Sequence, residues 1–125
     1  MSTLLPQLST EQPRKHPFNL DMVISPNVIN IYAELPGGLS YKDIILDFIS
    51  NRIIISYNKF RTYDNPDISE IVYGAQSRVV YIPYTVTDKN SVIVKYKKGM
   101  LYITINITNE MKEGFSLNVL DEKTN

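Results

Sequence analysis

The feature that most constrains the fold is a series of short apolar runs between Phe18 and Ile107. Within the runs, β-branched and aromatic residues alternate with polar ones, as in a strand that buries one face. Turn-forming residues separate the runs, and no stretch keeps an apolar period of about 3.6 residues long enough for a proper helix. In chain order the runs are FNLDMVI, NVINIYAEL, DIILDFI, RIIISYNKF, SRVVYIP, SVIVKYK and MLYITINI. The pattern predicts an all-β fold, an immunoglobulin-like β-sandwich.

Two pairs of runs are joined by turns short enough for hairpins. Ser50-Asn51 joins DIILDFI to RIIISYNKF, and Lys97-Lys98-Gly99 joins the last two runs. Asn and Gly tolerate the positive φ angles that such tight turns require. In three of these runs one set of alternate side chains is apolar and should form the core, namely Ile44, Leu46, Phe48, Ile53, Ile55, Leu101, Ile103 and Ile105.

One long interval interrupts this rhythm. Sixteen residues separate Tyr57 from Gly74, whereas a hairpin loop usually has about 2–5 residues. A loop of this length is normally either functional or disordered. Its last part, Ile68–Tyr73, is apolar enough for a short extra strand, but the predicted sheets offer that strand no evident partner.

The rest of the chain is expected to form tails on one domain. Within its 125 residues, the domain should cover residues 18–107. Residues 1–17 hold three prolines among Ser, Thr and Gln, which predicts a short flexible arm, and residues 108–125 should form a flexible C-terminal tail. The N-terminus lacks a signal-peptide pattern, and no apolar run approaches the ~20 residues that span a bilayer, so the default location is cytoplasmic.

The composition argues against most kinds of chemistry. The chain has no cysteine, and its thirteen basic residues balance thirteen acidic ones, which disfavours nucleic acid or a membrane as partner. Pro36-Gly37-Gly38 lacks the spacing of a nucleotide-binding loop, and the lone His16 has no metal or catalytic constellation around it. Asp64, Asp67 and Glu70 lack the spacing of a calcium loop. We therefore predict no enzyme activity, no catalytic residue and no cofactor or metal.

Three motifs nevertheless occur in a recognisable order along the domain. ELPGGLSYKDI (Glu34 to Ile44) is similar to L-P-G followed by a polar stretch and D-I. YGAQSRVVYIP (Tyr73 to Pro83) is similar to Y-G-x-F-x-R-x-F-x-L-P, with Arg78 at the arginine. VKYKKGMLYITI (Val94 to Ile105) is similar to A-x-x-x-x-G-V-L, with Gly99 in register. Together they resemble the small heat-shock proteins, the α-crystallin-domain (Hsp20) family.

The resemblance implies an ATP-independent holdase, a chaperone that binds non-native client proteins and keeps them from aggregating. It also implies that the long interval carries a strand exchanged with a partner's early strand, which gives a homodimer and higher homo-oligomers. The expected dimer-interface residues are Leu20, Met22, Ile68, Glu70, Ile71 and Arg78. A buried guanidinium at Arg78 would need a carboxylate such as Glu70 or Asp67.

The same resemblance implies a role for the C-terminal tail. The family ends in an I-x-I-like pair that docks in a neighbouring subunit's groove. Leu117 and Val119 match this pair best, with Phe115 and Leu117 as an off-register competitor. The expected groove residues are Leu46, Phe48, Val92 and Val94. Because Val94 stands where the family usually has alanine, the groove should be shallower.

Other functions of the same sandwich stay open at this point. One alternative is a structural or assembly protein, and another is a co-chaperone of the p23/CS type, each without holdase activity. The p23/CS strand order lacks the exchanged-strand loop and the A-x-x-x-x-G-V-L motif. A β-sandwich enzyme is a further alternative, although no residue of this sequence is nominated for catalysis.

Overall fold

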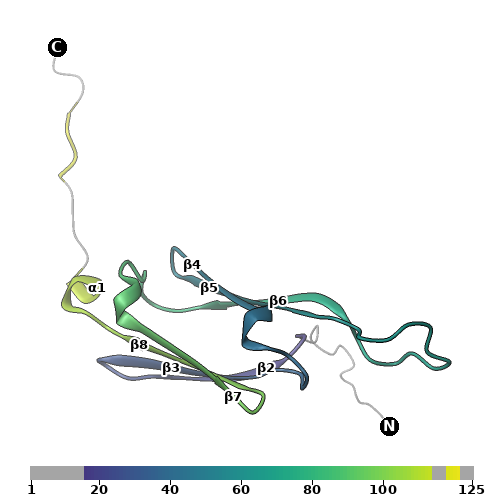
Figure 1. Ribbon diagram of the computed structural model, residues 1–125. Coiled ribbons are helices and arrows are strands. Elements are labelled where there is room, and N and C mark those ends of the chain that lie inside the picture. Colours follow the sequence, from purple (N-terminus) through teal and green to yellow (C-terminus); the bar gives the residue numbers. More distant parts are fainter. Residues whose placement is uncertain (1–15, 114–117, 122–125) are drawn as a thin grey trace, which may run out of the picture.

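The computed structural model describes residues 16–113 and 118–121 (Figure 1). Most of the predicted arm 1–17 and part of the predicted tail, Leu117 included, therefore lie outside the described residues. The strands are β2 (Asn19–Ile24), β3 (Val28–Glu34), β4 (Ile44–Ile49), β5 (Arg52–Lys59), β6 (Gly74–Tyr81), β7 (Val92–Lys97) and β8 (Met100–Asn106). Three short helical elements accompany them, the 3-10 turns η1 (Tyr41–Asp43) and η2 (Lys89–Ser91) and the helix α1 (Asn109–Glu113).

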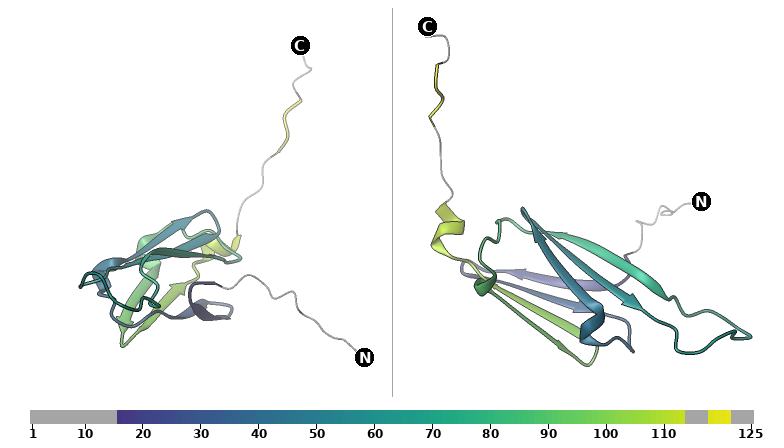
Figure 2. Two further views of the ribbon diagram at one scale, coloured as in Figure 1. Left: turned by 90° about the vertical axis from the view of Figure 1, so that its right-hand side faces the viewer. Right: turned by 45° about the horizontal axis from the view of Figure 1, so that its top comes forward.

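The strands form two antiparallel sheets that face each other (Figures 1 and 2). One sheet has four strands in the order β2-β3-β8-β7, and the other has three in the order β4-β5-β6. This arrangement confirms the predicted all-β sandwich, and each predicted strand run corresponds to one observed strand. Both predicted hairpins are also present, as β4-β5 and β7-β8.

The core lies between the sheets and consists mainly of isoleucine. The predicted residues Ile53, Ile55, Leu101, Ile103 and Ile105 are all buried there. Further buried members come from β3, β5, β6 and the segments that flank the strands, namely Phe18, Ile29, Ile31, Ala33, Leu35, Leu39, Tyr57, Val80, Ile82 and Ile107. The β4 side chains predicted for the core point inward but are only partly buried, because β4 is an edge strand.

Positive φ angles mark the turns that the sequence predicted. Ser50 has a φ of 55° in the β4-β5 turn, and Lys98 and Gly99 have φ values of 51° and 82° in the β7-β8 turn. Gly99 also accepts a hydrogen bond of 2.8 Å on its carbonyl from the backbone N–H of Leu35. The Pro-Gly-Gly stretch turns at Gly38, where φ is 84°, and delivers the chain to η1 and β4. These glycines therefore form the turn by which the chain passes from one sheet to the other.

The interval between β5 and β6 differs from its predicted form. Ile68–Tyr73 was expected to form a short strand, but in this single chain it has no strand conformation. A strand needs a ladder partner for its backbone groups, and this loop extends beyond the end of its own sheet (Figures 1 and 2). The expectation of an extra strand is thus wrong for the isolated protomer. Within the described residues the segment pairs with neither sheet, as the sequence predicted.

Candidate functional site: the two open sides of the sandwich

Within residues 16–113 and 118–121 the sandwich has two open sides, because the outer strands of both sheets have an edge that pairs with no other described strand. On one side β4 lies across from β7, and the side chains of these strands line a common groove. On the other side β6 lies across from β2, where a hydrogen bond joins Arg78 to the residue before β2. Unpaired edges are natural places for another chain to add.

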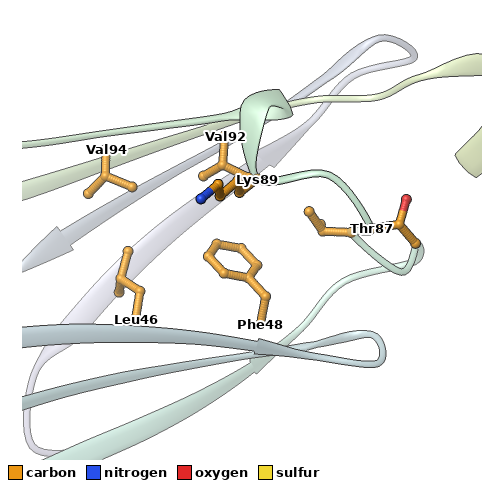
Figure 3. A pocket seen from close by; sticks show the side chains of 7 residues that line it. Leu46, Phe48, Thr87, Lys89, Val92 and Val94 are labelled. Carbon is orange, nitrogen blue, oxygen red and sulfur yellow. The ribbon is translucent and has the colours of Figure 1, made fainter.

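The groove between β4 and β7 consists of two adjoining cavities. The first has a volume of about 490 Å³, and its lining includes all four predicted groove residues, Leu46, Phe48, Val92 and Val94 (Figure 3). The second, of about 360 Å³, is lined by Tyr41, Ile44, Leu46, Val94, Tyr96 and Leu101. Leu46 and Val94 line both cavities and so stand between them. The structure thus brings together the four residues that the sequence nominated.

Two short capped turns set the ends of this groove. Before β4, the Ser40 hydroxyl accepts a hydrogen bond from the N–H of Lys42 while the Asp43 carboxylate accepts one from the N–H of Ser40. Before β7, the Asp88 carboxylate accepts a bond of 2.9 Å from the N–H of Asn90. The reciprocal pair at Ser40 and the single bond at Asp88 satisfy N–H groups at the start of each turn. They fix where β4 and β7 begin.

Sequence reasoning missed the groove residues that lie outside the strands, two of which are polar. Val86, Thr87 and Lys89 precede β7 and complete the lining of the first cavity. The sequence Asp-Lys-Asn-Ser, which starts at Asp88, could have predicted the position of Lys89. It is typical of a capped turn, and such a turn places Lys89 beside the start of β7. Lys89 is the one charged residue among those that line the two cavities.

Arg78 holds the β2/β6 side of the sandwich together. Its Nη1 donates a hydrogen bond of 3.0 Å to the carbonyl oxygen of Phe18, which immediately precedes β2. Its Nε is buried, and no acceptor lies within reach among the described residues. Glu70 and Asp67, the expected carboxylate partners, do not pair with it within the described part of this chain. A buried donor without a partner is costly, so this guanidinium has capacity for an acceptor from another chain.

The other predicted interface residues divide into two groups. Leu20 and Met22 of β2 are partly buried and pack on the core of their own sandwich. A partner that adds to the second edge of β2 would therefore bind its backbone groups rather than these side chains. Ile68 and Ile71 lie in the β5-β6 loop and are well exposed, Ile68 at 76% of its surface. Glu70 is exposed between them. The structure of one chain therefore keeps the two groups apart.

The β5-β6 loop is closed near its base by its own side chains. The hydroxyls of Tyr63 and Tyr73 share a hydrogen bond of 2.9 Å. The Arg61 guanidinium stacks 5.1 Å from the centre of the Tyr73 ring and also donates a bond of 3.1 Å to the Ser69 hydroxyl. The bond to Tyr73 raises the pKa of Tyr63 above its usual value of 10.0. We call this cluster of Arg61, Tyr63, Ser69 and Tyr73 the loop clasp; the sequence did not predict it.

The described part of the tail begins at α1, which packs against the sandwich. Met111 contacts the core, and the Lys112 amine donates a hydrogen bond of 2.7 Å to the side-chain oxygen of Asn27 in the β2-β3 turn. The Thr108 hydroxyl accepts a bond from the N–H of Met111 at the start of the helix. Val119 of the predicted tail motif is 96% exposed in this single chain.

The remaining candidates lie apart from one another. His16 is exposed ahead of β2. Asp64, Asp67 and Glu70 are spread along the exposed loop, and among residues 16–113 and 118–121 no group of three or more His, Cys, Asp or Glu side chains could hold a metal ion. In the same ranges no helix is long and apolar enough to cross a membrane.

Known structures share this arrangement of strands. Heat shock protein 16.0 from Schizosaccharomyces pombe matches 86% of this chain and 100% of its own with a TM-score of 0.62 and 20% identity. A mutant of hsp14.1 from Sulfolobus solfatataricus matches 82% of this chain and 77% of its own with a TM-score of 0.63 and 20% identity. HSP18.5 from E. histolytica matches 85% of this chain and 98% of its own with a TM-score of 0.58 and 22% identity.

This chain has the α-crystallin-domain fold of the small heat-shock proteins. No protein-family profile and no curated protein sequence matches it. The α-crystallin-domain likeness therefore lies in structure at low sequence identity, with the three motifs of the sequence in place on it. The p23/CS-type alternative is not favoured by these matches.

Proposed function

We propose that this chain is a small heat-shock protein that works as an ATP-independent holdase, built from strand-exchanged homodimers. It would consist of an arm (residues 1–17), the α-crystallin domain (18–107) and a docking tail (108–125), and would act in the cytoplasm on non-native client proteins. The observation that carries the proposal is that two parts of one protomer lack partners and could pair with the same parts of a second copy. The outer edge of β2 pairs with no other strand in the described part of the chain, and the β5-β6 loop holds an exposed apolar segment that belongs to neither sheet.

Strand exchange between two copies would pair the β2 edge of each with the β5-β6 loop segment of the other. Ile68, Ile71 and Val72 expose large apolar side chains, and the second edge of β2 presents backbone groups that pair with no strand among the residues that the structure describes. When an extended segment adds to an edge strand, main-chain hydrogen bonds supply affinity and alternate side chains supply specificity. Because the loop extends past its own sheet, the edge of a second copy is a suitable acceptor (Figure 2). A two-fold symmetric dimer would use each edge and each loop once per protomer.

Arg78 supports the same interface. It stands on the β2/β6 side with a buried Nε that lacks an acceptor within the described chain. Glu70 lies in the loop that would cross to the partner. A carboxylate delivered by the partner's loop would give the guanidinium a charge-assisted hydrogen bond, which is stronger than a neutral one.

The groove would receive the tail of a neighbouring subunit. Its two cavities adjoin at Leu46 and Val94. Leu117 and Val119 are two residues apart, which in extended chain places both side chains on one face about 7 Å from each other. That spacing suits two neighbouring apolar cavities. Docked tails would join dimers into larger homo-oligomers.

Clients would bind to apolar surface that the assembly leaves exposed. The outward face of the three-stranded sheet carries four large exposed apolar side chains, Ile45, Ile49, Val79 and Tyr81. Apolar patches of this kind mark interaction sites. Binding of a non-native protein lowers the concentration of the species that aggregates, and this effect needs no nucleotide.

The test uses reduced insulin, whose B chain aggregates when its disulfides are cut. Since this chain has no cysteine, the reductant leaves the chaperone itself unchanged. We expect the full chain to suppress light scattering without ATP. Ile49→Ser should weaken protection, while Ile93→Ser, equally exposed on the other sheet, is the matched control. Unhindered aggregation at stoichiometric excess of the full chain would refute the holdase and favour an assembly module of the same fold.

A further inference from the structure

The groove between β4 and β7 is chemically different at its two ends. The cavity next to the start of β7 contains Lys89, and Figure 3 shows this side chain beside Val92 with its amine toward the groove. The other cavity is lined by aliphatic and tyrosine side chains alone. A cation at one end of an apolar groove distinguishes the two directions in which an extended segment can lie.

The tail carries a matching asymmetry. In an extended chain, Leu117, Val119 and Asp121 fall on one face, because alternate residues point the same way. Asp121 therefore follows the apolar pair on the face that would enter the groove. Glu122 is equally acidic but has the opposite parity and would point away.

We infer that the Lys89 amine binds the Asp121 carboxylate of a docked tail and thereby fixes the direction of docking; this rests on the tail docking proposed above. Val119 then occupies the cavity that contains Lys89, and Leu117 occupies the cavity lined by Tyr96. The tail runs antiparallel to β7 and parallel to β4.

Two of the other arrangements leave Lys89 without a carboxylate. In the reverse direction, Phe115 would lie beside Lys89 and Asp121 would lie past the tyrosine-lined cavity. With Phe115 and Leu117 in the cavities, Val119 would take the place beside Lys89. In the reverse direction with Phe115 and Leu117 in the cavities, Glu113 would lie next in line beside Lys89, but Glu113 is the last residue of α1 and is not part of an extended segment. Charge complementarity thus favours the direction and register in which Asp121 meets Lys89.

This direction also decides whose groove the tail occupies. Val92 pairs with Ile105, so the Lys89 cavity lies at the α1 end of the sandwich, while Leu101 lines the distant cavity. From Ile107 to Leu101 a strand covers about 20 Å, and α1 is held beside Ile107 by the bond between Lys112 and Asn27.

From the end of α1, the four residues to Leu117 reach at most about 14 Å. A chain therefore cannot place its own Leu117 in its own distant cavity in this direction. The occupant is the tail of a second copy. The Lys89–Asp121 contact is an intermolecular one.

Charge reversal in the full chain tests this directly. Asp121→Lys and Lys89→Glu should each raise the midpoint concentration for dissociation of oligomers into dimers by about fivefold or more. The double variant Lys89→Glu/Asp121→Lys should recover most of the loss. Glu122→Lys, the parity control, and Lys95→Glu, on the outward face of β7, should change the midpoint less than twofold, about the scatter of such a titration. The difference between variants should shrink near 1 M salt, where the screening length is about 3 Å.

The outcomes separate this inference from the proposed function. If truncation at Phe115 yields dimers but Asp121→Lys and Glu122→Lys behave alike, the tail docks and the inferred direction is wrong. If the double variant is no better than either single one, the Lys89–Asp121 contact is likewise overturned. If truncation leaves the mass unchanged, tail docking itself fails.

Discussion

Arg78→Met should have a small effect on the stability of the protomer and a large effect on the affinity of the dimer. In one chain, removing the guanidinium loses the bond to the Phe18 carbonyl, which costs about 1.5–3 kcal/mol for a charged donor. It also removes a buried Nε without an acceptor, and relief of such a group returns about 1–3 kcal/mol. The free energy of unfolding of the protomer should therefore change by less than about 2 kcal/mol.

The dimer should respond far more strongly. Truncating one partner of a buried charged pair across an interface costs about 2–5 kcal/mol, which raises Kd about 30- to 5000-fold. Each pair occurs twice in a two-fold symmetric dimer, so this range is a lower bound. Sedimentation over a concentration series gives Kd, and urea unfolding at a concentration below Kd gives the protomer's stability. Arg52→Met, which removes an outward-facing guanidinium from β5, is the matched control.

The opposite pattern would refute the reasoning. If Arg78→Met lowers protomer stability by several kcal/mol while Kd equals that of the control, Arg78 serves only the contact between β6 and the start of β2.

Three other predictions follow from the groove, the tail and the loop. Val94→Ala should deepen the groove between its two cavities and, judged by light scattering, shift the mass distribution toward larger oligomers at equal concentration; a shift toward dimers would contradict tail docking. Truncation before Phe115 should leave dimers in size-exclusion chromatography, since the docking pair is lost, and an unchanged elution volume would contradict it. Tyr63→Phe should accelerate hydrogen exchange in the β5-β6 loop, because the loop clasp loses its bond to Tyr73. Because the pKa of Tyr63 is raised, this bond stabilises the loop below pH 10 and is lost as the pH rises through the folded-state pKa. Hydrogen exchange measured against pH, and corrected for the intrinsic exchange rate, should therefore become equal in wild type and Tyr63→Phe above that pKa.

The strands and the core could be predicted from the sequence because both depend on local alternation. Ile53, Ile55 and Tyr57 recur at a period of two along β5 and are buried, and a one-residue slip would expose them. The four groove residues followed from the family resemblance, and the structure brings them together.

The remaining features depend on contacts between segments far apart in the sequence. Arg78 reaches the Phe18 carbonyl across sixty residues, and no local pattern specifies that bond. The bond between Tyr63 and Tyr73 depends on how the loop returns on itself, and the contact of Lys89 with the groove depends on the cap at Asp88. The segment Ile68–Tyr73 was read as a strand from its apolar content, yet a strand exists only with a partner edge.

The most direct test of the central claim is the solution mass of the full chain beside a variant that lacks residues 65–72. In the proposed dimer, the loop of one copy completes the β2 edge of the other. Across a concentration series, sedimentation should show dimers and larger species for the full chain and monomers for the deletion variant, with circular dichroism verifying that its sandwich remains folded. A folded deletion variant that still forms dimers would contradict the account, because the dimer would then rest on a different interface.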